Sequence, residues 1–219
     1  MAINILFEDN HIIVVEKEEN VLSQGDITND PNMVDLLKTY IKDKYNKPGN
    51  VFVGLIHRLD RRVSGVMVFS KTSKAASRLS ASIVNNEFKK SYIAVVDGYL
   101  EGNKKLIHKL VKKNNIAVED KNGKECILYY NVIKNITNKD HQMSVLDIDL
   151  ITGRYNQIRK QLSLTGHPIV NDFKYGYHKK NYNDQFGLRC YMISFPHPIT
   201  KEILSFKIDY ENWYSNYIK

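Results

Sequence analysis

The sequence predicts an α+β fold made of a single domain over residues 1–219. After residue 89 the chain consists mostly of strand-like runs separated by Gly, Asn, Asp and Lys turns, which indicates antiparallel β structure. Only three stretches place apolar residues at helical spacing. Because no repeat, low-complexity tract or linker-like boundary interrupts the chain, we expect the strands and helices to share one domain.

Capping residues predict where the helices begin and end. Asp30 is the expected cap of the first helix, and Pro31 is its expected first helical position. Thr72 or Ser73 is the expected cap of the second helix. The third helix, within RYNQIRKQLSLTG, is expected to end just before Gly166. The expected apolar faces are Val34, Leu37, Tyr40 and Ile41 in the first helix and Ala76, Leu79, Ile83 and Val84 in the second.

Apolar and β-branched runs predict the strands. NILFEDNHIIVVEK is typical of two strands around an acidic turn, and VFVGLI and VMVFSKT flank a polar stretch. The other expected strands are KKSYIAVVDGYL, IHKLVKK, NIAVED, KECILYYNVIK, QMSVLDIDLIT, RCYMISFPHP and EILSFKI.

Charge and cysteine content limit the partners and the compartment. The net charge of +8 and the pI near 9.2 suit a polyanionic partner, although a chain that is simply rich in lysine fits them equally well. Cys126 and Cys190 form no CxxC motif, which favours a reducing compartment. The acidic N-terminus differs from a signal peptide, and no apolar run approaches the ~18 residues that span a membrane. We expect a cytoplasmic protein.

The polar stretch HRLDRRVSG, residues 57–65, contains an aspartate among arginines. Asp60 forms either a surface salt bridge on a solvated turn or a reactive carboxylate that nearby cations keep ionised. If the stretch is a strand, Arg58 and Asp60 share a face. The local sequence leaves both readings of Asp60 open.

Two further segments carry candidate functional residues. In TGRYNQIRKQL, Arg154 and Arg159 can grip phosphate, one of them can pair with a buried acid, or the segment is an exposed basic helix face. In KKSYIAVVDG, Tyr92 is either a packing residue or a catalytic contact. The chain has no HExxH, GxGxxG or GxxxxGK[ST] motif, so we predict no metal and no nucleotide cofactor.

Together and in this order, these segments resemble the RluA-type family of RNA pseudouridine synthases. HRLDRRVSG is similar to the family's HRLDxxTSG signature, and KSYIAVVDG is similar to its KxYxAxVxG strand. TGRYNQIRKQLSLTGHPIVNDFKYG resembles TGRxHQIRxHxxxxGHPIxGDxxYG. The resemblance covers nearly the whole chain.

The resemblance implies a role for each matched residue. Asp60 matches the catalytic aspartate, and Arg159 matches the arginine that pairs with it. Tyr92 matches the tyrosine that packs against the target base, and Arg58 matches an arginine that helps displace the target nucleotide. Asp60 would then be both salt-bridged and reactive. The other expected substrate contacts in these motifs are His57, Arg154 and Gln157.

The resemblance also implies a fold, a partner and an absence of cofactors. The expected fold is a mixed, mainly antiparallel sheet flanked by helices and loops, with a central RNA cleft. The expected substrate is structured RNA, ribosomal RNA first and transfer RNA second, without a membrane or an obligatory protein partner. We expect a monomer that needs no cofactor, since the isomerisation moves no electrons and adds no group. The catalytic domain would begin near residue 3, without an N-terminal S4 domain.

Several positions depart from the family pattern. Val63 stands where the signature has threonine, and Asn156 and Gln161 replace two histidines. KEEN (17–20) replaces a Lys-Pro-x-Gly turn, and VND (170–172) replaces the usual glycine before aspartate. These departures bear on substrate choice and efficiency.

Two other functions are compatible with the sequence. One is an RNA-binding or RNA-folding protein that keeps the fold without depending on catalysis. The other is a nucleoside or sugar hydrolase that uses Asp60 alone, which the positive charge disfavours. RNA binding that survives Asp60→Ala without any product favours the first alternative, and activity on free uridine favours the second.

Overall fold

The computed structural model describes residues 3–138, 141–179 and 184–218, and its compact parts are two units. The first unit consists of Met1–Lys89 and Met192–Ile208. The second unit consists of Lys90–Tyr191 and Asp209–Lys219. Strand β10 (Leu188–Pro196) passes from the second unit into the first along the chain. The prediction of one domain stays a prediction.

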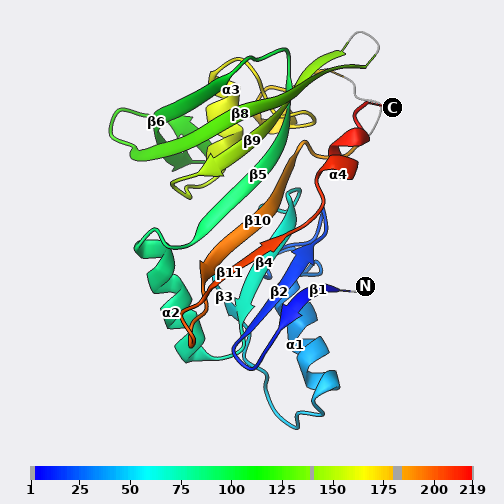
Figure 1. The fold of residues 1–219 in the computed structure, drawn as a ribbon, viewed down its shortest axis with the longest axis vertical. Coiled ribbons are helices and arrows are strands. Elements are labelled where there is room, and N and C mark those ends of the chain that lie inside the picture. The colour runs from blue at the N-terminus through cyan, green and yellow to red at the C-terminus, as the bar shows by residue number, and fades with distance from the viewer. Residues whose placement is uncertain (1–2, 139–140, 180–183, 219) are drawn as a thin grey trace. The chain divides into compact units, whose positions relative to one another are not determined.

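The first unit contains strands in the order β1-β2-β4-β10, with β3 beside β4 and β11 beside β10 (Figure 1). The β1–β2, β2–β4, β3–β4 and β10–β11 pairs are antiparallel. Strand β4 is buried along its whole length, and β2 along most of it, because their Val, Ile and Met side chains form the core. The strands are β1 (Asn4–Glu8), β2 (Ile12–Lys17), β3 (Gly54–Leu55), β4 (Ser64–Ser70) and β11 (Ile203–Lys207).

Helix α1 (Met33–Lys44) begins two residues later than predicted. Its cap is Asn32, whose side-chain oxygen accepts a hydrogen bond from the Asp35 N–H at 3.1 Å. The prediction of Asp30 and Pro31 as its start is therefore wrong, although Leu37 and Ile41 are buried as expected.

Helix α2 (Ser73–Val84) has Thr72 as its cap, one of the two predicted residues. Its buried face is Ala75, Leu79 and Ser82, so the predicted face is rotated: Val84 is 79% exposed. The helix packs against β3 and β4.

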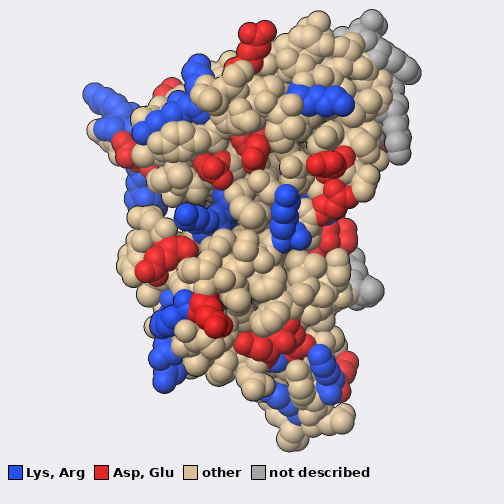
Figure 2. Space-filling model, viewed as in Figure 1, with Lys and Arg blue, Asp and Glu red and all other residues tan. Residues whose placement is uncertain are grey.

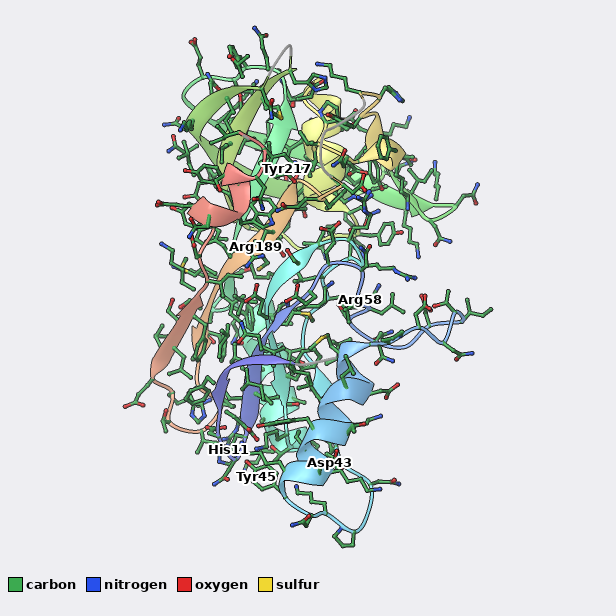
Figure 3. All side chains as sticks on the ribbon, turned by 90° about the vertical axis from the view of Figure 1, so that its right-hand side faces the viewer. His11, Asp43, Tyr45, Arg58, Arg189 and Tyr217 are labelled. Carbon is green, nitrogen blue, oxygen red and sulfur yellow. The ribbon has the colours of Figure 1, made fainter. Side chains whose placement is uncertain are left out.

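The second unit contains antiparallel strands in the order β5-β9-β8-β6-β7. Helix α3 (Gln157–Leu164) and the 3-10 helix η1 (Phe173–Tyr175) pack together, and α3 lies against β6 and β7 on one side of these strands (Figures 1 and 3). The strands are β5 (Lys89–Asp97), β6 (Asn103–Lys113), β7 (Ile116–Glu119), β8 (Lys124–Asn138) and β9 (His141–Leu150). The α+β class and the mainly antiparallel pairing are confirmed.

The ends of α3 follow from two left-handed residues. Asn156, with φ 48°, turns the chain into the helix, and Gly166, with φ 81°, turns it out, as predicted. Eight of the nine non-glycine residues with positive φ in the described ranges are asparagines. The short helix α4 (Glu211–Ser215) was not predicted, because five residues carry no helical period.

Cys126 and Cys190 are buried free thiols. Within the described ranges, no helix combines the length and apolarity that crossing a membrane requires.

Candidate active site

Asp60 lies in the first unit, on the loop between β3 and β4. The loop is not a strand, so Arg58 and Asp60 do not share a strand face. A turn closes at Asp60, whose carbonyl accepts a hydrogen bond from the Val63 N–H at 3.0 Å. Arg58, labelled in Figure 3, has an exposed side chain, whereas Asp60 is partly buried.

The backbone on both sides of Asp60 is held by the segment that follows β2. Ser23 Oγ donates to the Leu59 carbonyl at 2.7 Å and accepts from the Leu59 N–H at 3.1 Å. The Asn20 N–H donates to the Arg61 carbonyl at 2.9 Å. The residues before and after Asp60 are thus held by the same neighbouring segment, which fixes the position of the Asp60 backbone.

Lys17 is the third support of this loop, and its side chain is fully buried. Its Nζ donates to the carbonyls of Glu18, Val21 and Arg61 at 2.9, 2.8 and 3.1 Å. Burial lowers the pKa of this ammonium to about 8, against the opposing attraction of nearby carboxylates, of which Asp60 is the strongest. In the sequence, this lysine stood out only as the first residue of KEEN (17–20). The sequence signal that could have revealed its burial is its place at the end of the apolar strand IIVVEK.

The other charged residues of the signature have partners of their own. Arg61 pairs with Asp30 at 2.6 Å, and Arg62 lies 3.7 Å from Glu19. Both pairs are partly exposed, so each contributes about 0–1 kcal/mol of stability.

His57 is buried in the first unit. Its Nε2 accepts a hydrogen bond from the Val68 N–H at 3.3 Å, and its ring lies 5.2 Å from that of Phe88. These contacts order the loop against β4. The expected contact of His57 with substrate stays a prediction.

Tyr92 lies in the second unit, in the middle of β5, where it pairs with Ile148 of β9. Only 6% of its surface is exposed. The predicted strand is confirmed. The role expected for Tyr92 against a target base stays a prediction.

Arg159 forms a two-point salt bridge inside the second unit. Its Nε and Nη2 each donate at 2.8 Å to a different oxygen of Asp172, which is 1% exposed. A buried acid was one of the partners expected for Arg154 or Arg159, and in the structure the acid bound to Arg159 is Asp172. Asp60 and Arg159 belong to different units, and their expected pairing stays a prediction.

Arg154 and Gln157 are brought together at the start of α3. Gln157 Oε1 accepts from the Arg154 N–H at 3.1 Å and from Thr152 Oγ1 at 2.8 Å, while its Nε2 donates to Ile127 and Gln161. Gln157 thus orders the loop that presents the exposed Arg154. Contact of either residue with substrate stays a prediction.

The two family histidines that this chain lacks are replaced by residues with defined contacts. Asn156 Nδ2 donates to Tyr175 Oη at 2.9 Å. Gln161 Nε2 donates to the carbonyls of Leu106 and Cys126 and contacts His108 Nδ1 at 3.0 Å. Both substitutions therefore keep polar side chains bonded in the interior.

The described part of the chain contains no cluster of three or more His, Cys, Asp or Glu side chains arranged to hold a metal ion.

Comparisons with known proteins identify the family. Residues 11–164 match the family described as RNA pseudouridylate synthase. The chain is 31% identical over 221 residues to ribosomal large subunit pseudouridine synthase C of Buchnera aphidicola subsp. Baizongia pistaciae, covering 94% of this chain and 67% of that relative. It is 28% identical to the dual-specificity RNA pseudouridine synthase RluA of Haemophilus influenzae, covering 93% of this chain and 91% of that relative.

A solved structure supports the fold. Human RNA pseudouridylate synthase domain containing 1 has a TM-score of 0.78 to this chain at 20% identity, covering 98% of this chain and 86% of that one. The α+β architecture is therefore that of pseudouridine synthase domains. On these matches, the chain belongs to the RNA pseudouridylate synthase family, the enzymes that isomerise uridine in RNA.

Proposed function

We propose that this enzyme converts particular uridines in structured RNA to pseudouridine, with Asp60 as its catalytic carboxylate. Ribosomal RNA is the first substrate class and transfer RNA the second. The relatives named above support this choice, since one is named for the large ribosomal subunit and the other for dual specificity.

The reaction conserves every atom of the nucleotide. The bond between C1′ of the ribose and N1 of uracil breaks, the base turns, and a bond forms between C1′ and C5. The proton on C5 is lost and N1 ends protonated, so no electron or group enters. One carboxylate can assist by adding to the sugar or by acting as a base at the 2′ position. Because the detached uracil is a tolerable anion, the reaction has less need of a second acid than glycoside hydrolysis has.

One observation carries the assignment of Asp60: hydrogen bonds fix the backbone on both sides of this partly buried acid. Ser23 holds Leu59, and Lys17 and Asn20 hold Arg61. A catalytic carboxylate must keep its position while the substrate reacts, whereas a solvated surface acid needs no such support.

The remaining site residues act on the target nucleotide in this proposal. Arg58 assists its displacement from the helix, and Tyr92 packs against the uracil, which together offset an unstacking cost of a few kcal/mol. Arg159 pairs with Asp60 when the site is assembled. The supporting contacts to substrate come from His57, Arg154 and Gln157.

The proposal includes three further statements. The catalytic body comprises residues 1–219, and the enzyme works as a monomer without an obligatory protein partner. It acts in the cytoplasm, which agrees with its two buried free thiols. Light scattering during gel filtration tests the monomer, with a single species at 25.4 kDa as the expected result.

Purified Asp60→Asn tests the catalytic assignment. Total RNA from cells lacking the gene is incubated with wild type or variant, and pseudouridine is mapped by carbodiimide-dependent reverse-transcriptase stops. We expect wild type to form one or a few sites and Asp60→Asn to form none, at unchanged RNA binding. Asp30→Asn, which alters another acid of the same unit, should remain active.

The outcomes separate the alternatives. Full activity of Asp60→Asn would show that Asp60 is not the catalytic group. RNA binding by wild type with no product on any RNA would favour an RNA-binding function, and turnover of free uridine would favour a hydrolase.

A further inference from the structure

The second unit carries a row of cations and aromatic rings that begins at Arg159. Arg159 Cζ lies 4.9 Å from the ring centroid of Tyr175, and Lys174 Nζ lies 5.9 Å from the same centroid. Lys174 Nζ also lies 5.7 Å from the centroid of Tyr155, and Lys112 Nζ lies 4.7 Å from it. These five side chains, Arg159, Tyr175, Lys174, Tyr155 and Lys112, are called the cation–ring row below.

The rings of the row are fixed by their hydroxyl groups. Tyr175 Oη accepts hydrogen bonds from the Ala117 N–H at 2.8 Å and from Asn156 Nδ2 at 2.9 Å. Tyr155 Oη donates to the Asn115 carbonyl at 3.0 Å, and Lys174 Nζ donates to the same carbonyl. The row therefore ties α3, η1 and the turn between β6 and β7 together, so its cations project from a rigid base.

The cations of the row differ in their charge balance. Arg159 is neutralised by Asp172, and the neighbouring Lys113 pairs with Asp120 at 2.9 Å. Lys112 and Lys174 are exposed, and in the described ranges no carboxylate forms a salt bridge with either of them. These two ammonium groups remain available to an anion from outside the chain.

We propose that Lys112 and Lys174 of the cation–ring row bind backbone phosphates of the RNA that flanks the target uridine. This inference deepens the proposed function and rests on it. Phosphates are the expected ligand because ammonium groups held against rings present positive charge at the surface, and phosphate contacts position RNA without reading its bases. The row leads from the predicted catalytic Arg159 outward to the β6–β7 turn.

The competing explanation is a diffuse positive charge without a defined track. Figure 2 shows Lys and Arg interspersed with Asp and Glu on the face it presents, so lysine alone marks no site. Strand β6 provides a matched control. One face of β6 carries every second residue, among them Leu106, Leu110 and Lys112. His108 lies on the same face and contacts Gln161 of α3.

Lys105 lies on the opposite face of the same strand and serves as that control. Its Nζ lies 5.4 Å from the ring of Tyr129, its cross-strand partner. It is therefore also a lysine held against a tyrosine, but outside the row.

The test measures RNA affinity of the full chain against KCl concentration, by anisotropy of a fluorescent oligo-uridylate of about twenty nucleotides. For Lys112→Gln/Lys174→Gln, we expect the slope of log K against log salt to fall by about 1.4, since each single-strand phosphate contact contributes roughly 0.7. The affinity at low salt should fall about tenfold or more. Lys105→Gln should keep the wild-type slope.

Each other outcome has one meaning. An unchanged slope in the double variant, or an equal fall in Lys105→Gln, would overturn the phosphate track while leaving the catalytic proposal intact. Failure of wild type to bind the oligo-uridylate would also overturn the phosphate track, whereas the absence of product on every RNA would overturn the proposed function itself. As a control, the unfolding temperature of each variant is measured. A temperature equal to that of the wild type shows that the substitution leaves the fold unchanged.

Discussion

Ser23 and Leu59 exchange two hydrogen bonds, with Ser23 Oγ donating to the Leu59 carbonyl at 2.7 Å and accepting from the Leu59 N–H at 3.1 Å. Both residues are buried, and Leu59 immediately precedes Asp60. A single hydroxyl thus satisfies both backbone groups of the residue next to the proposed catalytic acid. Ser23 and Leu59 are 36 residues apart in the sequence.

Ser23→Ala should therefore impair catalysis more than binding. Loss of the hydroxyl leaves two buried backbone groups without their partner, which costs about 1–3 kcal/mol of stability. The loosened loop should lower kcat on RNA by roughly tenfold, at nearly unchanged RNA affinity. Ser82→Ala is the control, because Ser82 is equally buried and donates to Leu79 within α2, away from Asp60. Equal kcat in both variants would contradict the positioning role of Ser23.

The buried ammonium of Lys17 should make stability depend on alkaline pH. Its pKa of about 8 in the folded chain lies below its ordinary value of 10.5, so between these values the unfolded chain binds more protons. The free energy of unfolding should therefore rise with pH in this window, by roughly 1–3 kcal/mol between pH 8 and 10. Urea unfolding at several pH values measures this rise. Lys17→Met should lack it, and the same rise in both proteins would contradict the prediction.

Asp172→Asn should destabilise the chain by about 3 kcal/mol, because it leaves the largely buried guanidinium of Arg159 without its counter-charge. Asp120→Asn removes the charge from a more exposed pair with Lys113 and should cost clearly less stability than Asp172→Asn. Urea unfolding of both variants gives the comparison. The prediction is wrong if the two losses are equal.

Asn156 should tolerate histidine but not valine. Its φ of 48° suits Asn and His among the non-glycine residues, whereas a β-branched side chain is strained there. Asn156→Val also removes the bond to Tyr175 Oη, so we expect a loss of about 2–3 kcal/mol. Asn156→His should stay within about 1 kcal/mol of wild type. Thermal unfolding of the two variants measures the stability that each one loses. Similar losses of stability in both would exclude backbone strain as the cause.

Local sequence patterns predicted most of the elements because each depends on neighbouring residues. The apolar runs of β2 and β4, the Thr72 cap and the stop at Gly166 are examples. The start of α1 could not be predicted in this way. The Leu22 N–H donates to the Pro31 carbonyl and the Leu22 carbonyl accepts from the Met33 N–H, and this distant pairing sets Asn32 as the cap.

The candidate site also has residues that the sequence predicted and residues that it did not. The resemblance of motifs was needed to single out Asp60, Tyr92 and Arg159. Judged by its neighbours alone, each of them also fitted an ordinary structural role, as a surface ion pair, a packing residue or part of an exposed basic helix face. The supports of the site were missed because their partners are distant in sequence: Lys17 reaches Arg61, 44 residues away. A lysine in an inward strand position signals burial, but not which carbonyl it meets.

The frequent left-handed asparagines affect the unfolded chain as well as the folded one. Glycine adopts positive φ without strain, but it gives the unfolded backbone more conformations to lose on folding. A turn built with asparagine accepts a small conformational strain and starts from a less disordered chain. Replacing such an asparagine by glycine thus relieves strain in the folded chain and raises the conformational entropy of the unfolded chain. Part of the stability of this protein is therefore determined by the unfolded chain, before any tertiary contact forms.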